Sequence, residues 1–176
     1  DFCLSRGLGD VYKRQVYLFH DTIENNIKFG CPNATHEQVV EAAGKACCHD
    51  FISALPDGYD TVIGEGGATL SGGEKQRISI ARCLLKNAPI VIFDEATANV
   101  DPENEDQLQR AIEALTREKT VLMIAHRLKT VRNADQILVL DQGRIVQRGT
   151  HEELSAQEGI YQDFVSERTA AGHWSL

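Results

Sequence analysis

Two short segments near the middle of the sequence carry groups suited to phosphate chemistry. Residues 71–73 (Ser-Gly-Gly) precede a helical pattern, and Asp94 and Glu95 follow the apolar run at 90–93. A glycine-rich turn at a helix N-terminus offers free N–H groups and the positive end of the helix dipole, which attract phosphate oxygens. A carboxylate at the end of a buried strand can hold Mg²⁺, and its neighbour can polarise a water molecule. Together the two segments predict a nucleoside triphosphatase.

Each segment also has an ordinary structural interpretation. Ser71 can simply cap a helix, and Ser-Gly-Gly taken alone favours that interpretation. Asp94 and Glu95 can be an acidic pair that caps a helix, although a buried strand would direct both side chains to one place. In the chemical interpretation, Ser71 Oγ donates a hydrogen bond to a phosphate and the two glycines let the backbone approach closely. Glu95 then orients or deprotonates the attacking water.

A histidine follows a second apolar run. Residues 120–125 (TVLMIA) are expected to form a buried strand with His126 at its end, and residues 90–93 form a strand of the kind buried on both faces. Adjacent parallel strands would bring Glu95 and His126 to the same sheet edge, where α/β folds bind ligands. A lone histidine would more often be structural. The remaining histidines lack such a context and are expected at the surface: His20, His36, His49, His151 and His173.

Helical and strand patterns alternate along the chain, which predicts an α/β fold with a mainly parallel sheet. Thr35 with Gln38 and Thr150 with Glu153 have the spacing of helix caps, and the glycine-rich residues 59–68 are expected to form a solvent loop. Helices are expected after Asp21 or Thr22, at 35–47, after a cap at Asp50, at 71–86, 102–116 and 127–133, after the cap at Thr150, and at 159–168. Strands are expected at 90–93 and 120–125, and at 136–140 and 144–147 around a turn at 141–143.

Composition narrows the function classes. The 176 residues are enough for one domain with a sizeable core, and the net charge of −8 leaves no basic stripe for nucleic acid. No apolar run reaches the ~20 residues that span a bilayer, so another segment or chain would supply any membrane-spanning part. The five cysteines form no disulfide framework and no CxxC pair, which favours buried or half-buried thiols in a reducing compartment.

The central motifs resemble those of a known family. LSGGEKQR at 70–77, followed by IVIFDEAT at 90–97, is similar to the signature and Walker B motifs of ABC (ATP-binding cassette) ATPases, and the resemblance covers roughly residues 16–176. It implies a P-loop NTPase-like ABC ATPase domain: a mainly parallel sheet with an inserted helical subdomain. The helical subdomain is expected at about 32–88, and the C-terminal part of the ATPase core at about 89–176.

The resemblance implies roles for the signature residues. ATP-binding positions are expected at Leu70, Ser71, Gly72, Gly73 and Gln76. In this family the signature loop acts in trans, on ATP held by a second nucleotide-binding domain, so that domain is the expected partner. For Gln76 and Arg77, a solvated polar helix face is an adequate alternative.

The resemblance also implies roles for the residues that follow the strands. Asp94 matches the Walker B aspartate that contacts Mg²⁺, and Glu95 matches the catalytic carboxylate. His126 matches the histidine that contacts the γ-phosphate, and this match favours a functional histidine over a structural one. Asp101 matches the D-loop, whereas Ala98 and Asn99 depart from the Ser-Ala-Leu-Asp of many relatives. ATP and Mg²⁺ are the expected cofactors.

One motif of the family does not occur in the sequence. There is no GxxxxGK followed by Ser or Thr, and therefore no phosphate cradle with its lysine. Residues 1–15 resemble a translated sequencing adapter and are interpreted as a non-native scar, so Gln15 is not assigned to the Q-loop. The expectation is an N-terminally truncated domain that binds ATP poorly and hydrolyses none by itself.

The segments YDTVIGEGGATLSGGEKQR at 59–77 and GTHEEL at 149–154 look like exporter-type domains fused behind a membrane domain. We therefore expect the ATPase of an ABC transporter at the cytoplasmic face of a membrane, with a transmembrane domain fused upstream and no nucleic-acid partner. Two alternatives are open. One is an ABC ATPase of chromosome maintenance or DNA repair, which would carry long heptad repeats. The other is a catalytically silent half-site. The sequence does not indicate a transported substrate.

Overall fold

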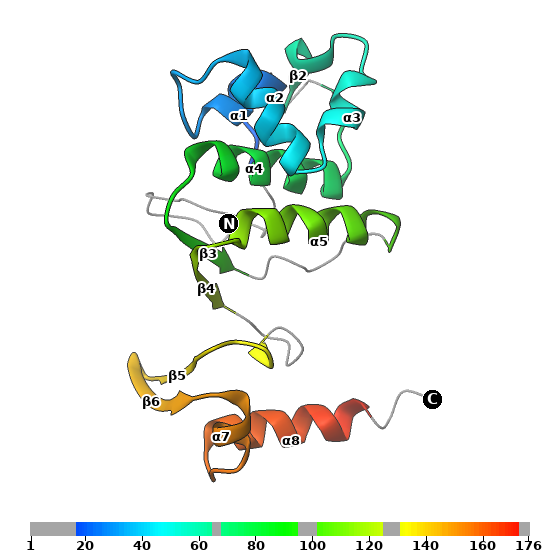
Figure 1. Ribbon diagram of the computed structural model, residues 1–176. Helices are drawn as coiled ribbons and strands as arrows, with labels where there is room; N and C mark the ends of the chain where they lie inside the picture. The colour runs from blue at the N-terminus through cyan, green and yellow to red at the C-terminus, as the bar shows by residue number, and fades with distance from the viewer. Residues whose placement is uncertain (1–16, 65–67, 95–101, 125–130, 173–176) are drawn as a thin grey trace. The chain divides into compact units, whose positions relative to one another are not determined.

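The computed structural model describes residues 17–64, 68–94, 102–124 and 131–172, in two compact units divided between Ile124 and Ala125 (Figure 1). The elements of the first unit are β1 (Asp21–Thr22), α1 (Ile23–Lys28), α2 (His36–Lys45), α3 (His49–Ser53), the 3₁₀ turn η1 (Gly58–Asp60), β2 (Val62–Ile63), α4 (Gly72–Lys86), β3 (Ile90–Asp94), α5 (Pro102–Thr116) and β4 (Thr120–Ile124). Those of the second are β5 (Ile137–Asp141), β6 (Arg144–Gly149), α7 (His151–Ser155) and α8 (Ile160–Gly172). The alternation of helices and strands confirms the α/β class.

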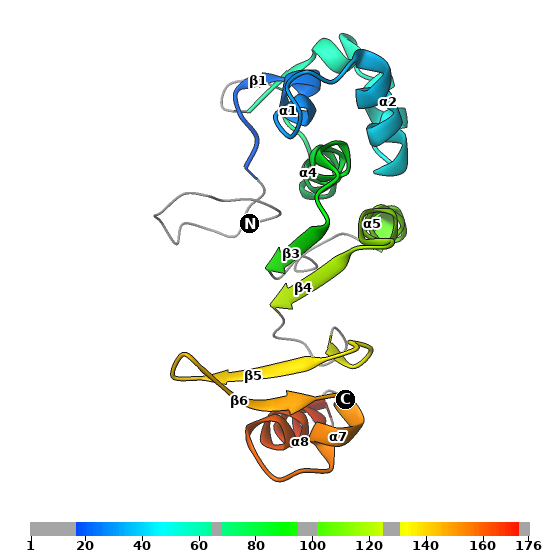
Figure 2. The same cartoon turned by 60° about the vertical axis from the view of Figure 1, so that its left-hand side comes forward.

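Helix α4 lies at the centre of the first unit. It contacts α1 and α2 on one side and α5 on the other, as Figures 1 and 2 both show. Its side chains Ile78, Ile80 and Ala81 are fully buried in one continuous apolar core. Other members of that core are Ile23, Ile27, Val39, Ala43, Ile52, Ile63, Val91, Phe93, Leu108, Ala111 and Leu115. Because full burial of each isoleucine contributes about 1.5–3 kcal/mol, α4 is the main support of this unit.

Most helix ends follow the local sequence signals, and one does not. Thr22 caps α1, and Thr35 forms a full capping box with Gln38 at α2. Asp50 was expected to cap the next helix, and this is wrong because Asp50 lies inside α3. The N-cap of α3 is Cys48, whose side chain makes no capping hydrogen bond. The chain enters α3 early because Cys47, with φ of 53°, ends α2 in a left-handed conformation.

Strands β3 and β4 are parallel and in register from Ile90 opposite Thr120 to Asp94 opposite Ile124 (Figure 2). Strand side chains alternate between the two faces of a sheet, so Val91 and Phe93 enter the core while Ile90 and Ile92 do not. The expectation of burial on both faces was therefore wrong for β3. The expectation of a buried strand at β4 was also wrong: its five residues are all exposed, and its main described neighbour is β3.

In the region expected to be a solvent loop, the described residues include a short strand and buried side chains. Thr61 and Ile63 are buried, and β2 pairs antiparallel with β1, so Ile63 lies opposite Asp21. Gly64 has φ of 100°, and a Cβ at this position would lie within 2.9 Å of backbone atoms of His20 and Phe19. The loop interpretation failed because a partner strand forty residues away in sequence, rather than local composition, orders this segment.

The second unit is a hairpin followed by two helices. The predicted turn between β5 and β6 is confirmed, with Gln142 and Gly143 at φ of 46° and 76°. Two consecutive positive φ values are those of a type I′ turn, whose twist matches that of paired strands. Thr150 forms the predicted capping box with Glu153 at α7. A small core contains Ile137, Leu154 and Tyr161.

Two histidines expected at the surface are instead half-buried and bonded to tyrosines. His49 Nδ1 lies 2.9 Å from the Tyr59 hydroxyl, and His151 Nδ1 lies 2.9 Å from the Tyr161 hydroxyl. Burial raises the pKa of Tyr59 to about 12, so its hydroxyl stays protonated at neutral pH. Each pair joins residues ten positions apart, which a helical or strand pattern does not reveal.

The described cysteines are free thiols, as the sequence predicts: Cys31, Cys47, Cys48 and Cys83. Cys48 and Cys83 are buried, and the other two are partly buried. Burial raises the pKa of the Cys48 thiol to about 12, and its Sγ donates to the carbonyl of Ala43. Within the described ranges, no group of His, Cys, Asp and Glu could hold a metal ion.

Arg82 joins α4 to the segment that precedes it in sequence by more than fifty residues. Its Nε donates to the Asn26 carbonyl at 2.7 Å, and its terminal nitrogens donate to Asn26 Oδ1 and to the Tyr17 carbonyl. The guanidinium also lies 5.6 Å from the ring centres of both Phe19 and Phe29. Arg82 therefore satisfies buried acceptors of Asn26 and fixes the start of the described chain on α4.

We expect Arg82→Ala to lower the free energy of unfolding by about 2–3 kcal/mol, because it removes charged hydrogen bonds and two cation–π contacts. Arg82→Lys should recover less than half of this, since an ammonium group cannot span the same acceptors and rings. Urea denaturation measures both variants. Arg110→Ala is the control, because Arg110 is exposed and should change stability by no more than about 0.5 kcal/mol. Equal effects of Arg82→Ala and Arg110→Ala would contradict this account.

Candidate functional site

The residues proposed from sequence fall into three groups in the structure. Leu70, Ser71, Gly72, Gly73 and Gln76 are described in full, at the N-terminal end of α4. Asp94 is described as the last backbone position of β3. Glu95, Asp101 and His126 lie outside the described residues, so their assigned roles stay predictions.

Ser71 is the N-cap of α4 and is held by two hydrogen bonds to Glu74. The backbone N–H of Glu74 donates to Ser71 Oγ at 3.3 Å, and the backbone N–H of Ser71 donates to Glu74 Oε2 at 2.7 Å. Because Oγ already accepts one hydrogen bond, the hydroxyl hydrogen remains able to donate to another group. The structure therefore unites both interpretations of Ser71: it caps the helix and still presents a donor.

The two glycines occupy the first turn of α4. The N–H groups at the first positions of a helix have no intrahelical acceptor, and that of Glu74 is already taken by Ser71. The N–H groups of Gly72 and Gly73 thus have no intrahelical acceptor, and of these two residues only Gly72 is exposed. A Cβ at Gly72 would meet nothing within 4 Å, so packing does not require glycine there. The open space beside Gly72 lets a ligand approach the backbone closely.

Leu70 anchors the loop. Its side chain is only 6% exposed and belongs to the core cluster of the first unit. The side chain is therefore occupied by packing, and any contact of Leu70 with a ligand has to come from its backbone. Anchoring the residue before Ser71 fixes where the helix starts, which gives the donors of the first turn a defined direction.

Gln76 and Arg77 are not a solvated polar face. Arg77 is only 3% exposed, and its guanidinium lies 5.3 Å from the ring centre of Phe51. Gln76 Oε1 is buried and has no hydrogen-bond partner within the described part of the chain. A buried carbonyl oxygen without a partner costs about 1–3 kcal/mol.

The backbone register places the C-terminal ends of β3 and β4 side by side, with Asp94 opposite Ile124. Glu95 follows Asp94 directly in sequence, and His126 comes two residues after Ile124. The parallel pairing that the sequence predicts for these strands is thus present. It is the condition under which residues following two different strands can serve one ligand.

Sequence reasoning missed one member of this site. Glu74 was passed over, although Ser71 and Glu74 have the Ser-x-x-Glu spacing of a capping box. The two glycines between Ser71 and Glu74 favoured the interpretation of a phosphate-binding turn over that of a capping box.

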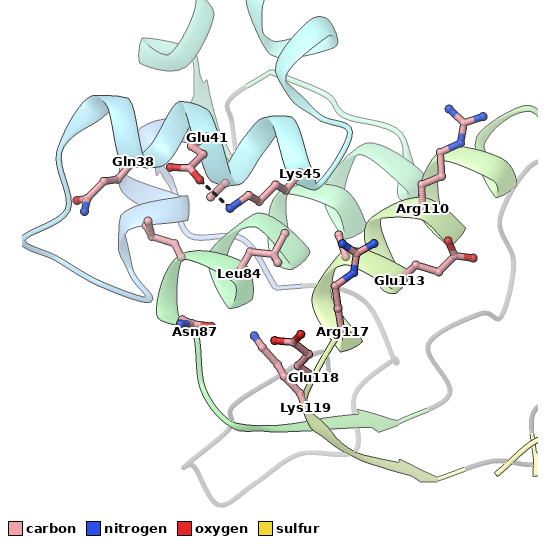
Figure 3. A pocket seen from close by; sticks show the side chains of 13 residues that line it. Gln38, Glu41, Lys45, Leu84, Asn87, Arg110, Glu113, Arg117, Glu118 and Lys119 are labelled. Carbon is pink, nitrogen blue, oxygen red and sulfur yellow. Dashed lines mark hydrogen bonds and ion pairs between the residues drawn. The ribbon is translucent and has the colours of Figure 1, made fainter. Parts of the chain in front are cut away.

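A cavity of about 560 Å³ lies at the other end of α4, near Asn87 (Figure 3). Its walls come from α2, α4, α5 and the residues after α5, and they carry both signs of charge, including the Glu41–Lys45 ion pair at 2.7 Å. Of the assigned residues that the structure describes in full, namely Leu70, Ser71, Gly72, Gly73 and Gln76, none lines this cavity. The candidate site is therefore the exposed first turn of α4 and not the concave region.

Comparison with known proteins decides the family. A profile described as "ABC transporter" matches residues 5–98, more than half of the chain, and it starts within the segment 1–15. The chain belongs to the ABC transporter family. The match includes the signature loop and β3, the two segments on which the resemblance was based.

Similar proteins are named as flippases or as multidrug export proteins. The chain is 55% identical over 158 residues to an ATP-dependent lipid A-core flippase of Syntrophus aciditrophicus, covering 90% of this chain and 26% of the relative. It is 53% identical over 149 residues to a putative multidrug export ATP-binding/permease protein of Staphylococcus aureus, covering 85% and 26%. The chain thus spans about a quarter of the length of these curated relatives.

A solved structure of a bacterial Atm1-family ABC exporter with ATP bound matches with a TM-score of 0.75 and 45% identity. The match covers 88% of this chain and 27% of the exporter chain, and it confirms the ABC ATPase fold. Among the described helices, none has the length and apolar character needed to cross a membrane.

We expect Gly72→Ala to leave the fold intact and to raise the free energy of unfolding by about 0.4–1 kcal/mol. The reason is that alanine has fewer unfolded conformations and its Cβ meets nothing at this position. Gly64→Ala is the contrasting variant, because φ of 100° and nearby backbone atoms should make it destabilising by more than about 1 kcal/mol. Thermal unfolding of both variants tests this. A large loss of stability in Gly72→Ala would show that the space beside Gly72 is not open.

Proposed function

We propose that this chain is the ATP-binding and ATP-hydrolysing region of an exporter-type ABC transporter, in which hydrolysis powers transport across a membrane. The observation that carries the proposal is the first turn of α4. A family signature loop there presents a serine hydroxyl, two glycine N–H groups and open space, which are the requirements of a terminal phosphate. The names of the flippase and multidrug-export relatives support transport as the use of that chemistry.

Ser71 and the N–H groups of Gly72 and Gly73 bind the γ-phosphate of ATP held by a second nucleotide-binding domain. The exposure of Ser71 and Gly72 supports this role, because groups at the surface of one domain can reach a nucleotide bound to another, whereas Gly73 is buried. Gln76 lies in the second turn of the same helix, and we assign it to the same interface. The active unit is thus a dimer of such domains, either identical or different.

The remaining roles follow the strand ends. Asp94 binds Mg²⁺, and Glu95 orients the attacking water and accepts its proton. His126 contacts the γ-phosphate, and Asp101 lies at the boundary with the second domain. When bound, Mg²⁺ neutralises negative charge on the β- and γ-phosphates. The parallel pairing of β3 with β4 supports this arrangement, because Glu95 and His126 follow neighbouring strand ends.

The organisation we propose places residues of about 32–88 in a helical subdomain and those of about 89–176 in the ATPase core. The concentration of α2, α3, η1 and α4 between residues 36 and 86 supports the first boundary. A transmembrane domain joined to this region would hold it at the cytoplasmic face of the membrane. Since the sequence holds no Walker A motif, the 176-residue chain by itself should bind ATP weakly and show no turnover.

We expect Glu95→Gln to slow ATP hydrolysis by about 10²–10⁴-fold in the complete transporter that carries this chain, because it removes the general base. ATP binding should persist, since glutamine has nearly the same shape. Steady-state hydrolysis and retention of labelled ATP on the purified protein measure the two effects. Retained turnover in this variant would remove Glu95 from its assigned role and favour a catalytically silent module.

We expect Ser71→Ala to reduce hydrolysis by about ten- to a hundred-fold in the same protein, because a hydrogen bond to a charged phosphate is lost. The variant also loses a helix cap, which costs about 1 kcal/mol of stability. Thr150→Ala is the matched control, since Thr150 caps α7 with the same two-bond geometry. It should lower stability to a similar degree and leave hydrolysis unchanged. If both variants hydrolyse ATP equally well, Ser71 is only a cap.

A further inference from the structure

The chain contains three described capping boxes of nearly identical geometry, at α2, α4 and α7. The N-cap N–H donates to Gln38 Oε1 at 2.9 Å in the first, to Glu74 Oε2 at 2.7 Å in the second and to Glu153 Oε2 at 2.8 Å in the third. The return bonds to the N-cap hydroxyls are 3.3–3.4 Å long. A neutral glutamine therefore builds this box as well as a glutamate does.

The box at α4 differs from the other two in what surrounds it. The two positions after the N-cap are His36 and Glu37 in α2, His151 and Glu152 in α7, but Gly72 and Gly73 in α4. Glycine has no side chain, so these two positions of α4 place no side chain beside the first N–H groups, and Gly72 is exposed. Glu74 is also the sole acidic residue in the first turn of α4. Its carboxylate thus supplies the negative charge of that turn next to the amides that face an incoming anion.

We propose that Glu74 has two opposing effects on this loop: its hydrogen bonds position Ser71 for phosphate, and its negative charge limits how tightly the phosphate is held. The proposal rests on the proposed function of residues 71–73 in phosphate binding. Its physical basis is that the geometry of the box needs only an acceptor oxygen, whereas the charge repels a second anion in the same helical turn. A loop with this composition captures a phosphate in a fixed orientation and releases it readily.

Two neutral variants separate these effects. Glu74→Gln keeps an acceptor for the Ser71 N–H, as Gln38 does for Thr35, and removes only the charge. Glu74→Ala removes the charge and the acceptor together. The ratio of affinities between Glu74→Gln and the wild type therefore isolates the charge, and the ratio between Glu74→Gln and Glu74→Ala isolates the positioning. Glu153→Gln and Glu153→Ala make the same changes in the box of α7, which has no glycine pair.

The experiment is a titration of the ¹⁵N-labelled 176-residue chain with inorganic tripolyphosphate, whose terminal phosphate resembles that of a nucleoside triphosphate. Amide shifts of Ser71, Gly72 and Gly73 report binding at this loop, and hydrogen exchange of the Ser71 amide reports the box. We expect Glu74→Gln to bind about two- to five-fold more tightly than the wild type with the Ser71 amide still protected. Glu74→Ala should bind at least about two-fold more weakly than Glu74→Gln, with faster exchange at Ser71.

The dependence of the affinity ratio on ionic strength distinguishes an effect of the Glu74 charge from a purely structural role of Glu74. The advantage of Glu74→Gln over the wild type should shrink between about 0.05 M and 0.5 M salt, because charges at this exposed turn are screened. The difference between the two neutral variants should persist. The Glu153 variants should leave the shifts at residues 71–73 unchanged at every salt concentration.

The possible failures are distinguishable. If tripolyphosphate shifts no amide of residues 71–73 in the wild type or in Glu74→Gln, both this proposal and the phosphate role of the loop are overturned. If the amides respond but Glu74→Gln binds no more tightly than the wild type, the charge effect is wrong while the phosphate role stands. Equal affinities of Glu74→Gln and Glu74→Ala would overturn the positioning effect.

Discussion

The packing of α4 into the centre of the first unit is the constraint on which the rest of that unit depends. The helix contacts α1, α2 and α5, and its fully buried Ile78 and Ile80 join the residues of these elements into one core. The same helix has Ser71 as its N-cap, and its first turn holds the N–H groups that we propose as phosphate donors. Since a well-packed helix is held rigidly, the burial that stabilises the unit also fixes the direction of these donors.

The beginning of α4 is exposed at Gly72, whereas later residues such as Arg77 are packed against other elements. At its beginning, Leu70 is buried and Gly72 stands in open space, so the chain passes from core to exposed turn within two residues. Further along, Arg77 and Arg82 bury their charged groups against aromatic rings, which ties α4 to α3 and to the segment before α1. The arginine contacts that fix α4 thus lie beyond its first turn, so they do not cover the N–H groups there.

Two independent lines support a nucleotide-dependent function for this ABC family member. One is the likeness to exporters, which covers most of this chain and about a quarter of theirs. The other is the local arrangement around Ser71, where an exposed hydroxyl and the Gly72 N–H are groups of the kind that bind phosphate. The agreement matters because family likeness alone does not show that a particular serine can still donate a hydrogen bond, whereas the capping geometry does.

The sequence by itself determined the features that depend on neighbouring residues. The boxes at Thr35 and Thr150, the turn at 141–143 and the helix from Pro102 follow from contacts within four residues, so local patterns predicted them. The family and its signature loop were also readable, because the motif is contiguous. Tertiary structure alone decided the burial of Arg77, the pairing of β1 with β2 and the exposure of β4. These features depend on which distant elements pack together, and no local period in a sequence carries that information.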